Sequence, residues 1–575
     1  MTTSMSSTQI VNSSTDALNP VNNSSNDAAN RSIQFRNQSY DDFNLPNQGF
    51  SLQNHGFNLP NQGFSLQNHG FNLPNQGLNI QTHGFNTQNQ GLRSFNQGFL
   101  AQNPGFSLLN RGFSSLNQDS QRQEALSSQH HHHHHHHEHH HVIAIKSLLP
   151  ATTCSEFRTR GKKGTLLPVF HKDGPCSPLS TVENGPKPQN YTHALIKDQS
   201  RVQSIHSRIS KGGVSIEPEE ARLPAESAAD FGSGNYYVKV GFGTRKRDLP
   251  LIFDTGSDLT WIQCQPCLGG CYEQSDPIYD PKKSSSYSNI PCNSTECTQL
   301  KSATGHLPSC MNSSCGYSIT YGDGSYSRGI SAHENLTITP SDTFPNFRFG
   351  CGQSNGGLFR GTAGLLGLGR DNISFVSQTS NKYKKVFSYC ISPSSYGFLA
   401  FGDSSSVKQF TPLLTDKRDP SFYFLNLTGI SVGALKLALS PSTFSLSGTI
   451  IDSGTVITRL PSSAYAALRS AFKHAMKSYP RAPKFDFLDT CYNFTGLKNV
   501  TLPKIVFHFQ GGADLDVHKS GILVETTGES QTCLAFIANK DARGVTIIGN
   551  LQQQTVEVVY DVAGGKLGFG PGGCN

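Results

Sequence analysis

Two short segments of this 575-residue chain each end a run of apolar residues in an aspartate, which small hydroxylated residues and a glycine follow at once. The first is LIFDTGSDLTW at 251–261, which contains Asp254, and the second is TIIDSGTVI at 449–457, which contains Asp452. Because Asp and Gly are common turn residues, either segment alone fits a capped turn at the end of a strand equally well. A matched pair is harder to explain as two unrelated turns.

Each half of the chain also contains a second apolar run, downstream of its aspartate, that ends in glycine. These runs are GLLGLG at 364–369 and TIIGN at 546–550, so the pattern indicates an internal duplication. If the two halves meet about an approximate twofold axis, the side chains of Asp254 and Asp452 face each other. Two carboxylates so near to each other cannot both ionise at low cost, so one keeps a proton while the other is charged. The charged carboxylate can take a proton from a water molecule, and the protonated one can donate to a substrate carbonyl.

The residues beside each aspartate suit such a pair. Glycine allows the backbone to approach closely, and the hydroxyls of Ser257 and Thr455 can hydrogen-bond the outer carboxylate oxygens. The residues expected to support the aspartates are Thr255, Gly256, Ser257, Ser453, Gly454 and Thr455.

Short β-rich runs must position these residues. From residue 235 onward, segments such as LPLIFDTGS, GYSITYGDGSYSRG and FYFLNLTGISVG are separated by Gly, Ser, Pro and Asn, a pattern that predicts a mostly β protein. The clearest helical pattern in this region is SSAYAALRSAFKHAMKSY at 462–479.

Residues from about 223 to 575 resemble pepsin-type aspartic proteases, specifically the plant nepenthesin-like branch. The matching motifs are DTGSDLTW (254–261), YGDGS (321–325), GLLGLGR (364–370), IIDSGT (450–455), IIGN (547–550) and GFGPGGC (568–574). The resemblance implies an all-β, bilobal fold with an active-site cleft between an N-terminal lobe at 225–410 and a C-terminal lobe at 411–575. It implies an acid endopeptidase that acts through Asp254 and Asp452 without metal or cofactor. A monomer that cleaves proteins or peptides at bonds flanked by large apolar residues is expected.

The resemblance also implies a hairpin flap over the cleft. Tyr321 would be the flap tyrosine, with Gly322 and Asp323 beside it in the turn. Trp261, the only tryptophan of the chain, would support Tyr321 through an indole-to-hydroxyl hydrogen bond.

The 14 cysteines favour an oxidising compartment, since none precedes Cys154 and 12 lie between Cys264 and Cys574. Zinc ligation is the alternative for the closely spaced Cys264, Cys267 and Cys271, but no histidine falls in 264–297. The resemblance implies six disulfides, whose connectivity spacing alone cannot establish. The expected pairs are 264–267, 271–351, 292–315, 297–310, 390–574 and 491–533.

Three segments precede the protease-like region. Residues 1–129 contain an Asn/Gln/Gly-rich heptad repeat, in which one glycine per seven residues and few charges argue against a coiled coil and predict disorder. Residues 130–141 are a histidine-rich tract. Residues 142–224 are interpreted as a removable pro-segment with a helix whose apolar face comprises Leu195, Val202, Ile205 and Ile209, while Lys197, Arg201 and Arg208 lie elsewhere on it.

The pro-segment motif LLPVFHKDGPCSPL resembles a subgroup that includes chloroplast-nucleoid DNA-binding and apoplastic members. By this analogy, basic residues of the pro-segment approach the aspartate pair and keep a zymogen inactive above acidic pH. Nucleic acid binding through the scattered basic residues of 142–222 is an alternative role, which the modest net charge of +7 does not favour. A catalytically inactive binding or inhibitor protein on the same fold is the other alternative.

The compartment is indicated by competing signals. Eight Asn-X-Ser/Thr sequons after residue 150 agree with the cysteines in favouring the secretory pathway or apoplast, whereas the Ser/Thr-rich N-terminus weakly suggests a chloroplast transit peptide. The first residues show no basic region followed by an apolar core, so no signal peptide is visible. No run of 18 apolar residues occurs, so no membrane span is expected.

Overall fold

The computed structural model describes residues 139–149, 152–155, 164–180, 191–210, 236–357, 359, 361–394, 396–402, 407–526, 530–571 and 574. These residues belong to one compact unit, His136–Asn575. The predicted disordered repeat of 1–129 and the histidine-rich tract up to residue 138 lie outside the described residues. Below, the N-terminal half means residues 236–402 and the C-terminal half means residues 407–571.

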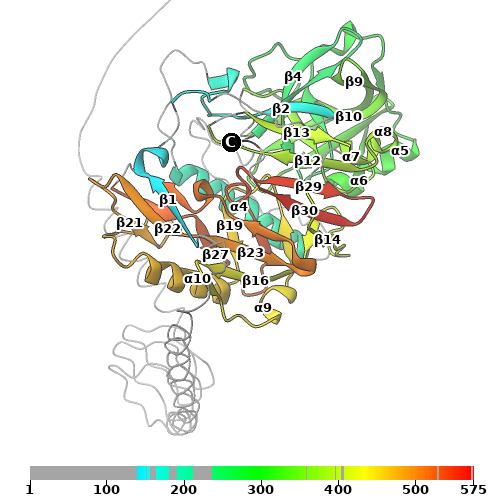
Figure 1. Ribbon diagram of the computed structural model, residues 1–575. Coiled ribbons are helices and arrows are strands. Elements are labelled where there is room, and N and C mark those ends of the chain that lie inside the picture. The colour runs from blue at the N-terminus through cyan, green and yellow to red at the C-terminus, as the bar shows by residue number, and fades with distance from the viewer. Residues whose placement is uncertain are drawn as a thin grey trace, which may run out of the picture. The chain divides into compact units, whose positions relative to one another are not determined.

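The largest sheet has 15 strands and draws on both halves of the chain (Figure 1). Its path is β14-β30-β29-β12-β13-β2-β3-β4-β11-β5-β10-β9-β8-β7, and β6 pairs with β9. The strands are β2 Thr165–His171, β3 Tyr236–Phe242, β4 Arg247–Asp254, β5 Trp261–Gln263, β6 Ser288–Asn289, β7 Ser309–Met311, β8 Ser314–Thr320, β9 Tyr326–Thr339, β10 Asp342–Gly356, β11 Gly364–Gly367, β12 Val386–Cys390, β13 Gly397–Phe401, β14 Phe410–Pro412, β29 Glu557–Asp561 and β30 Lys566–Gly570.

Four smaller sheets involve strands of the C-terminal half, in the orders β1-β22, β15-β18-β28-β19-β27, β17-β16-β23-β24 and β20-β21-β26-β25. Their strands are β1 His140–Ala144, β15 Tyr423–Leu425, β16 Leu427–Val432, β17 Leu435–Lys436, β18 Thr449–Ile451, β19 Thr458–Leu460, β20 Arg481–Ala482, β21 Cys491–Tyr492, β22 Asn499–Pro503, β23 Ile505–Phe509, β24 Asp514–Asp516, β25 Leu523–Glu525, β26 Thr532–Leu534, β27 Phe536–Ala538 and β28 Thr546–Ile548.

Helices are few, so the predicted all-β class is confirmed. The α-helices are α4 Tyr191–Ser210, α5 Thr295–Thr298, α6 Leu300–Thr304, α7 Phe375–Gln378, α8 Ser380–Tyr383, α9 Ser442–Ser445 and α10 Ser462–Ala475, and the 3-10 turns are η1 Ile145–Ser147, η2 Pro178–Ser180, η3 Pro281–Lys283, η4 Gln510–Gly512 and η5 Lys519–Gly521. The predicted helix at 462–479 corresponds to α10, which buries Ala464, Tyr465, Leu468 and Phe472 on one face. Among the described residues, no helix has both the length and the apolarity needed to cross a membrane.

The two halves repeat one strand arrangement around each aspartate. In the N-terminal half, β11 pairs in parallel with β4 and antiparallel with β5. In the C-terminal half, β28 pairs in parallel with β18 and antiparallel with β19. The apolar runs that suggested a duplication therefore form equivalent strands, and every residue of β11 and β28 is buried.

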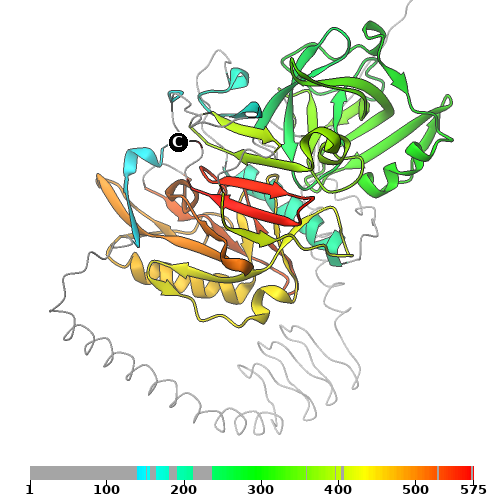
Figure 2. The same ribbon diagram turned by 45° about the vertical axis from the view of Figure 1, so that its right-hand side comes forward.

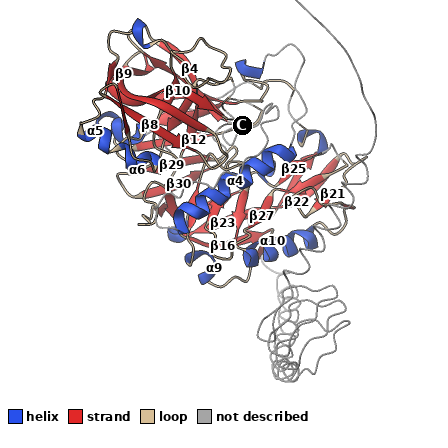
Figure 3. Ribbon diagram, turned by 180° about the vertical axis from the view of Figure 1, so that it is seen from behind, coloured by secondary structure: helices blue, strands red, loops and turns tan. Residues whose placement is uncertain are grey.

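The segment before residue 236 is built into the fold at three places. Strand β2 lies between β13 and β3 in the large sheet, and β1 pairs antiparallel with β22. Helix α4 lies between the two halves, as the view from behind shows (Figure 3). The β29–β30 hairpin of the C-terminal half extends the large sheet by pairing with β12 of the N-terminal half, and Figure 2 shows the hairpin beside these strands.

All 14 cysteines form disulfides, which excludes the zinc alternative for Cys264, Cys267 and Cys271. The expected pairs 390–574 and 491–533 are confirmed. The expected pairs 264–267, 271–351, 292–315 and 297–310 are wrong, and the seventh disulfide, 154–176, was not expected. The observed pairs are 154–176, 264–351, 267–271, 292–310, 297–315, 390–574 and 491–533.

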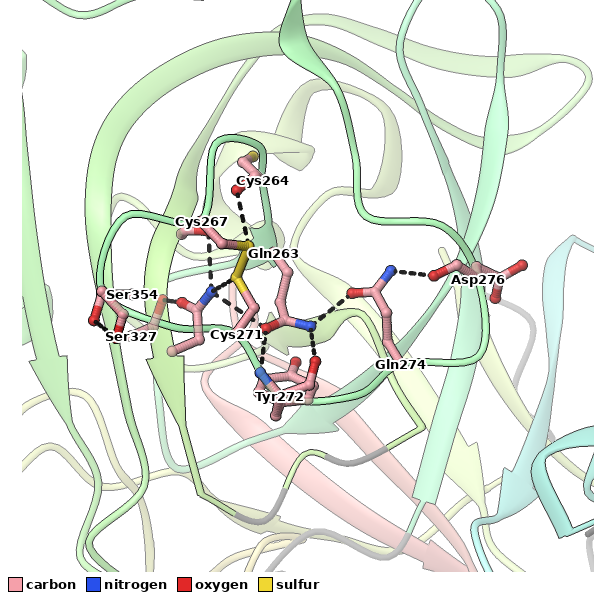
Figure 4. Close-up of a disulfide and its surroundings, with 12 residues drawn as sticks. Gln263, Cys264, Cys267, Cys271, Tyr272, Gln274, Asp276, Ser327 and Ser354 are labelled. Atoms are coloured by element: carbon pink, nitrogen blue, oxygen red, sulfur yellow. Dashed lines mark hydrogen bonds between the residues drawn. A yellow bond between two sulfur atoms is a disulfide. The ribbon is translucent and has the colours of Figure 1, made fainter. Parts of the chain in front are cut away.

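Tertiary structure explains these corrections. Strand β5 runs parallel to β10, which brings Cys264 beside Cys351, and the next two cysteines then close a short loop, Cys267 with Cys271 (Figure 4). Cys297 and Cys315 are both buried in one apolar cluster, and this pairing leaves the more exposed Cys292 and Cys310 to each other.

Candidate active site

The two aspartates occupy equivalent positions at strand ends. Asp254 is the last residue of β4, and its carbonyl accepts a hydrogen bond of 2.9 Å from the Leu368 amide after β11. Asp452 directly follows β18, and its amide donates to the Ile548 carbonyl of β28 at 3.1 Å. Both side chains are buried. Each aspartate is thus fixed by the inner strand of its own half.

Each carboxylate is held by the same two kinds of donor. The Gly256 amide donates to Oδ1 of Asp254 at 2.9 Å, and the Ser257 hydroxyl donates to Oδ2 at 2.7 Å. In the other half, the Gly454 amide donates to Oδ1 of Asp452 at 3.0 Å. The Thr455 hydroxyl donates to Oδ2 at 2.6 Å. Hydrogen bonds to the ionised form orient both side chains and lower the energy of a negative charge on them.

The two halves are joined directly between the aspartates. The Thr255 amide donates to the Ser453 hydroxyl at 3.1 Å, and the Ser453 amide donates to the Thr255 hydroxyl at 2.9 Å. This exchange is reciprocal, as expected for residues related by an approximate twofold axis.

Glycine is required at the position two residues after each aspartate. A Cβ atom on Gly256 would lie 2.7 Å from Oδ1 of Asp452, and one on Gly454 would lie 2.7 Å from Oδ1 of Asp254. Each glycine therefore touches the carboxylate of the opposite half. A side chain at either position would push the two aspartates apart.

The β8–β9 hairpin, called the flap below, carries in its turn the residues that the resemblance assigns to a flap. Its turn is closed by the Tyr321 amide donating to the Ser325 carbonyl at 2.8 Å, and Gly324 adopts φ +84°. Trp261 Nε1 donates to the Tyr321 hydroxyl at 2.8 Å. Asp323, in the same turn, accepts from the Ser325 amide at 2.9 Å. Burial raises the pKa of Tyr321 well above its ordinary value, so this hydroxyl stays protonated.

The disulfide loop after β5 supports the flap. Gln263 Nε2 donates to the Tyr272 carbonyl at 2.9 Å, and Gln263 Oε1 accepts from the Tyr272 amide at 3.1 Å (Figure 4). The Tyr272 ring packs against Phe359, whose ring also contacts those of Trp261 and Tyr321. The loop thus braces the aromatic side chains that hold the flap tyrosine.

Arg201 of α4 lies between the two aspartates. Its Nη2 is 2.9 Å from Oδ1 of both Asp254 and Asp452, and its Nε donates to Oδ2 of Asp452 at 3.0 Å. Burial alone would raise the pKa of Asp452, but the charge and hydrogen bonds of Arg201 outweigh burial and lower it below its ordinary value. Burial would likewise lower the pKa of Arg201, and the two carboxylates raise it instead.

Helix α4 packs against the C-terminal half on one face and contacts the flap on another. Leu195, Val202, Ile205 and Ile209, the predicted apolar face, are all buried. Val202, Ile205 and Ile209 pack against Phe422, Phe424, Ile450, Val545 and Ile547, whereas Leu195 joins the cluster around Ile457. On the flap side, a Cβ atom on Gly322 would lie 2.8 Å from the Arg201 Cα, so flap and helix are in close contact.

A second buried ion pair anchors α4 one turn before Arg201. Asp198 accepts hydrogen bonds from the amides of Val456 at 2.7 Å and Ile457 at 3.2 Å. The guanidinium Nη2 of Arg459 donates to the same carboxylate at 3.0 Å. The sequence pattern identified neither Asp198 nor Arg459 as a site residue. Arg459 is a charged residue within the largely apolar run VITRLP, whereas Asp198 lies among polar residues and gives no such signal.

Within the described ranges, no group of three or more His, Cys, Asp or Glu residues lies close enough together to hold a metal ion. The twelve residues singled out from the sequence lie in two connected places. Asp254, Asp452 and their six supporting residues form the centre between the halves, and Trp261, Tyr321, Gly322 and Asp323 belong to the flap and its support.

Two family models match the chain, xylanase inhibitor N-terminal at residues 236–403 and xylanase inhibitor C-terminal at residues 422–571. The chain is 50% identical over 445 residues to an aspartyl protease family protein of Arabidopsis thaliana, a match that covers 75% of this chain and 93% of the relative. It is 45% identical to the aspartyl protease AED1 of A. thaliana, over 75% of this chain and 92% of the relative.

The aspartic proteinase nepenthesin-1 of Nepenthes gracilis is 35% identical over 66% of this chain and 88% of its own length. Among solved structures, the crystal structure of edgp is similar with a TM-score of 0.49 and 22% identity, over 60% of this chain and 92% of that chain. The matches to curated relatives span most of their length, including both aspartate-bearing halves. The chain therefore belongs to the plant aspartyl protease family, together with the nepenthesins.

Proposed function

We propose that the protein is an acid endopeptidase in which Asp254 and Asp452 activate a water molecule to attack a peptide carbonyl. The observation that carries this proposal is that one guanidinium group bridges both carboxylates, each of which has a matching amide and hydroxyl donor. A site that places two buried carboxylates around one small group can place them around one water molecule as well.

In the proposed reaction, the water occupies the space that Arg201 fills in the full chain. One carboxylate accepts a proton from the water, and the other donates its proton to the substrate carbonyl as the tetrahedral intermediate forms. With the cation removed, mutual repulsion keeps one of the two carboxylates protonated under acidic conditions. The flap, with Tyr321 fixed by Trp261, covers the substrate and limits access of solvent.

We also propose that the chain is made as a zymogen. Arg201 occupies the catalytic position, and α4 lies against both the flap and the C-terminal half. The chain must release α4 before a peptide can reach the aspartates. Protonation of the carboxylates in acid removes the attraction for Arg201, which links activation to low pH.

Two other functions are less well supported. An inactive binding protein on this fold has no need of both aspartates with complete, matching donor sets. Nucleic acid binding, as in the chloroplast-nucleoid subgroup, requires an available basic surface. However, Arg201 is buried between carboxylates, and Arg208 pairs with Asp419 at 2.7 Å. We therefore propose peptide or protein substrates.

The secretory pathway or apoplast is the proposed compartment, in preference to the chloroplast. Seven disulfides need an oxidising compartment to form and persist. The seven described sequon asparagines are exposed or half-buried, as attached glycans require; they are Asn293, Asn312, Asn335, Asn372, Asn426, Asn493 and Asn499.

Acid activation of the secreted full-length chain tests the proposal. On lowering the pH, we expect loss of the segment before residue 236 and the appearance of peptide hydrolysis. A peptide with a tetrahedral hydroxyl group in place of the scissile carbonyl should block the hydrolysis, because it mimics the transition state. Hydrolysis that this inhibitor leaves unchanged, or no hydrolysis at any acidic pH, would rule out the proposed reaction.

A further inference from the structure

The buried pair of Asp198 and Arg459 lies about one helical turn from the place where Arg201 of the same helix contacts the two aspartates. Arg459 is on β19, seven residues after Asp452, and Asp198 is on α4, three residues before Arg201. One turn of helix rises about 5.4 Å, and an extended chain covers about 3.3 Å per residue. A group that binds Asp198 is therefore within reach of a substrate side chain about two residues from the scissile bond.

The surroundings of the Asp198 carboxylate form a complete carboxylate-binding site. Two adjacent backbone amides, those of Val456 and Ile457, and the Nη2 of Arg459 all donate to it. The side chains of Asp198 and Arg459 are each 1% exposed. Only Asp198 belongs to the segment that the proposed activation removes, so the three donors remain on the mature protein.

Arg459 is held in place without Asp198. Its Nη1 donates to the Ile457 carbonyl at 2.9 Å, and its backbone lies in β19 between β27 and β28. Its buried Nε has no hydrogen-bond partner among the described residues. Once α4 has left, the guanidinium therefore points into the vacated space with unused donor capacity.

There is also room for a side chain. A cavity of about 240 Å³ beside α4 is lined in part by Arg459, Val202, His206 and Lys540. Val202 and His206 leave with the helix, so the mature protein has a larger opening at the same place. In the full chain, burial removes water from both side chains of the pair, and this lowers the pKa of Arg459 and raises that of Asp198.

We propose that Arg459 is a specificity-determining residue that binds the carboxylate of an aspartate or glutamate side chain of the substrate, in the place that Asp198 holds in the full chain. This inference rests on the proposed protease function. It adds an acidic residue, about two positions from the scissile bond, to the apolar residues expected beside that bond. The site donates through two amides and a guanidinium, and so it prefers a carboxylate to an amide of the same shape.

The charges near the site give this preference a pH dependence. Arg201 and His206 also lie on α4 and leave with Asp198, whereas Lys540 and Asp541 of the loop after β27 remain at the cavity. The carboxylates of Asp254 and Asp452, which Arg201 contacts in the full chain, also remain. A substrate glutamate has an ordinary pKa of about 4.3. Its attraction to Arg459 is therefore strong at pH 5 and weak at pH 3.

The test is to map cleavage sites of the acid-activated protein in a peptide library and then to measure kcat/KM for peptide pairs that differ only by Glu or Gln at the enriched position. A charge-assisted hydrogen bond predicts about a 10-fold preference for Glu at pH 5. The preference should disappear in Arg459→Gln, and in the wild-type protein it should fall toward parity at pH 3.

Three further proteins control the experiment. Asp198→Asn alters only the removable segment, so its mature form should keep the full preference for Glu. The double variant Asp198→Asn with Arg459→Gln avoids an unpaired buried charge in the full chain and replaces Arg459→Gln if that variant folds poorly. Arg469→Gln on α10, whose guanidinium pairs with Asp489, is a matched control that should keep the preference.

Cleavage by the wild-type protein with no acidic preference, or a preference that survives in Arg459→Gln, would overturn the role of Arg459 and leave the protease function intact. Absence of cleavage of any peptide would instead overturn the proposed function and the substrate inference together. The two failures are therefore distinguishable.

Discussion

Replacing Arg201 by alanine should raise the pH at which the chain activates. In the full chain this guanidinium makes hydrogen bonds of 2.9–3.0 Å to the two aspartates, with its side chain only 8% exposed. Removing one partner of a buried charge pair costs about 3–5 kcal/mol. Since about 1.4 kcal/mol corresponds to a factor of ten, the equilibrium between docked and released α4 should shift toward release by roughly 100- to 1,000-fold or more.

The sign of the pH dependence is set by Asp452. Arg201 lowers the pKa of Asp452 in the docked state, so Asp452 stabilises docking above its ordinary pKa of 3.8 and ceases to do so as the pH falls through the lowered value. The released state of the proposed mechanism has one protonated carboxylate, so release takes up one proton, and each pH unit changes its free energy by about 1.4 kcal/mol. A loss of about 3–5 kcal/mol therefore moves the activation midpoint upward by about 2–4 pH units.

The assay follows pro-segment loss on gels and hydrolysis of a fluorogenic peptide after equal incubation over a range of pH. Arg208→Ala is the matched control, because Arg208 is on the same helix and pairs with Asp419 through a side chain that is 43% exposed. The Arg208 guanidinium is partly exposed and its partner is neither of the two aspartates of the site, so the midpoint of this variant should move by less than about one pH unit. A midpoint for Arg201→Ala that equals that of Arg208→Ala would refute the role of Arg201 in holding α4 against the two aspartates.

Three further predictions concern the site and its pH response. Gly454→Ala should lower kcat/KM by about 100-fold with unchanged circular dichroism, because the added Cβ would lie 2.7 Å from Oδ1 of Asp254; near-normal activity would contradict the close approach. Trp261→Phe removes the 2.8 Å bond to Tyr321 and should lower kcat/KM about 10-fold, and Tyr321→Phe should add little to it in a double-mutant cycle. Burial raises the pKa of Asp258 to about 7, so the contribution of Asp258 to stability is fully present below about pH 4 and is lost as the pH rises through 7. Asp258→Asn should therefore stabilise the protein against urea at pH 7.5 by up to about 4 kcal/mol and should not stabilise it at pH 4. An equal effect at the two pH values would contradict this prediction.

Much of the centre between the halves was accessible from the sequence. The apolar runs before Asp254 and Asp452, and the later runs that end in glycine, correspond to the strand pairs β4–β11 and β18–β28. These features are local and repeated, so a single sequence contains enough information to recognise them.

The remaining features depend on contacts between distant residues. The amphipathic pattern identified the apolar face of α4, but it could not identify which basic residue is buried, because the partners of Arg201 lie 53 and 251 residues away. The resemblance implied that basic residues of the pro-segment approach the aspartate pair, but it did not single out Arg201 among them. Cys264 pairs with Cys351, 87 residues away, because β5 lies beside β10, whereas its near neighbour Cys267 was expected.

Hydrolysis by a single aspartate variant tests the central claim most directly. A specific protease site inserted before residue 236 allows wild-type protein, Asp452→Asn and Asp254→Asn to be freed of the pro-segment in the same way. We expect the wild-type protein to hydrolyse a peptide in acid and each variant to lose at least about 1,000-fold in kcat, because an amide cannot exchange the proton that the reaction requires. Activity in either variant close to that of the wild-type protein would contradict a reaction that depends on both carboxylates.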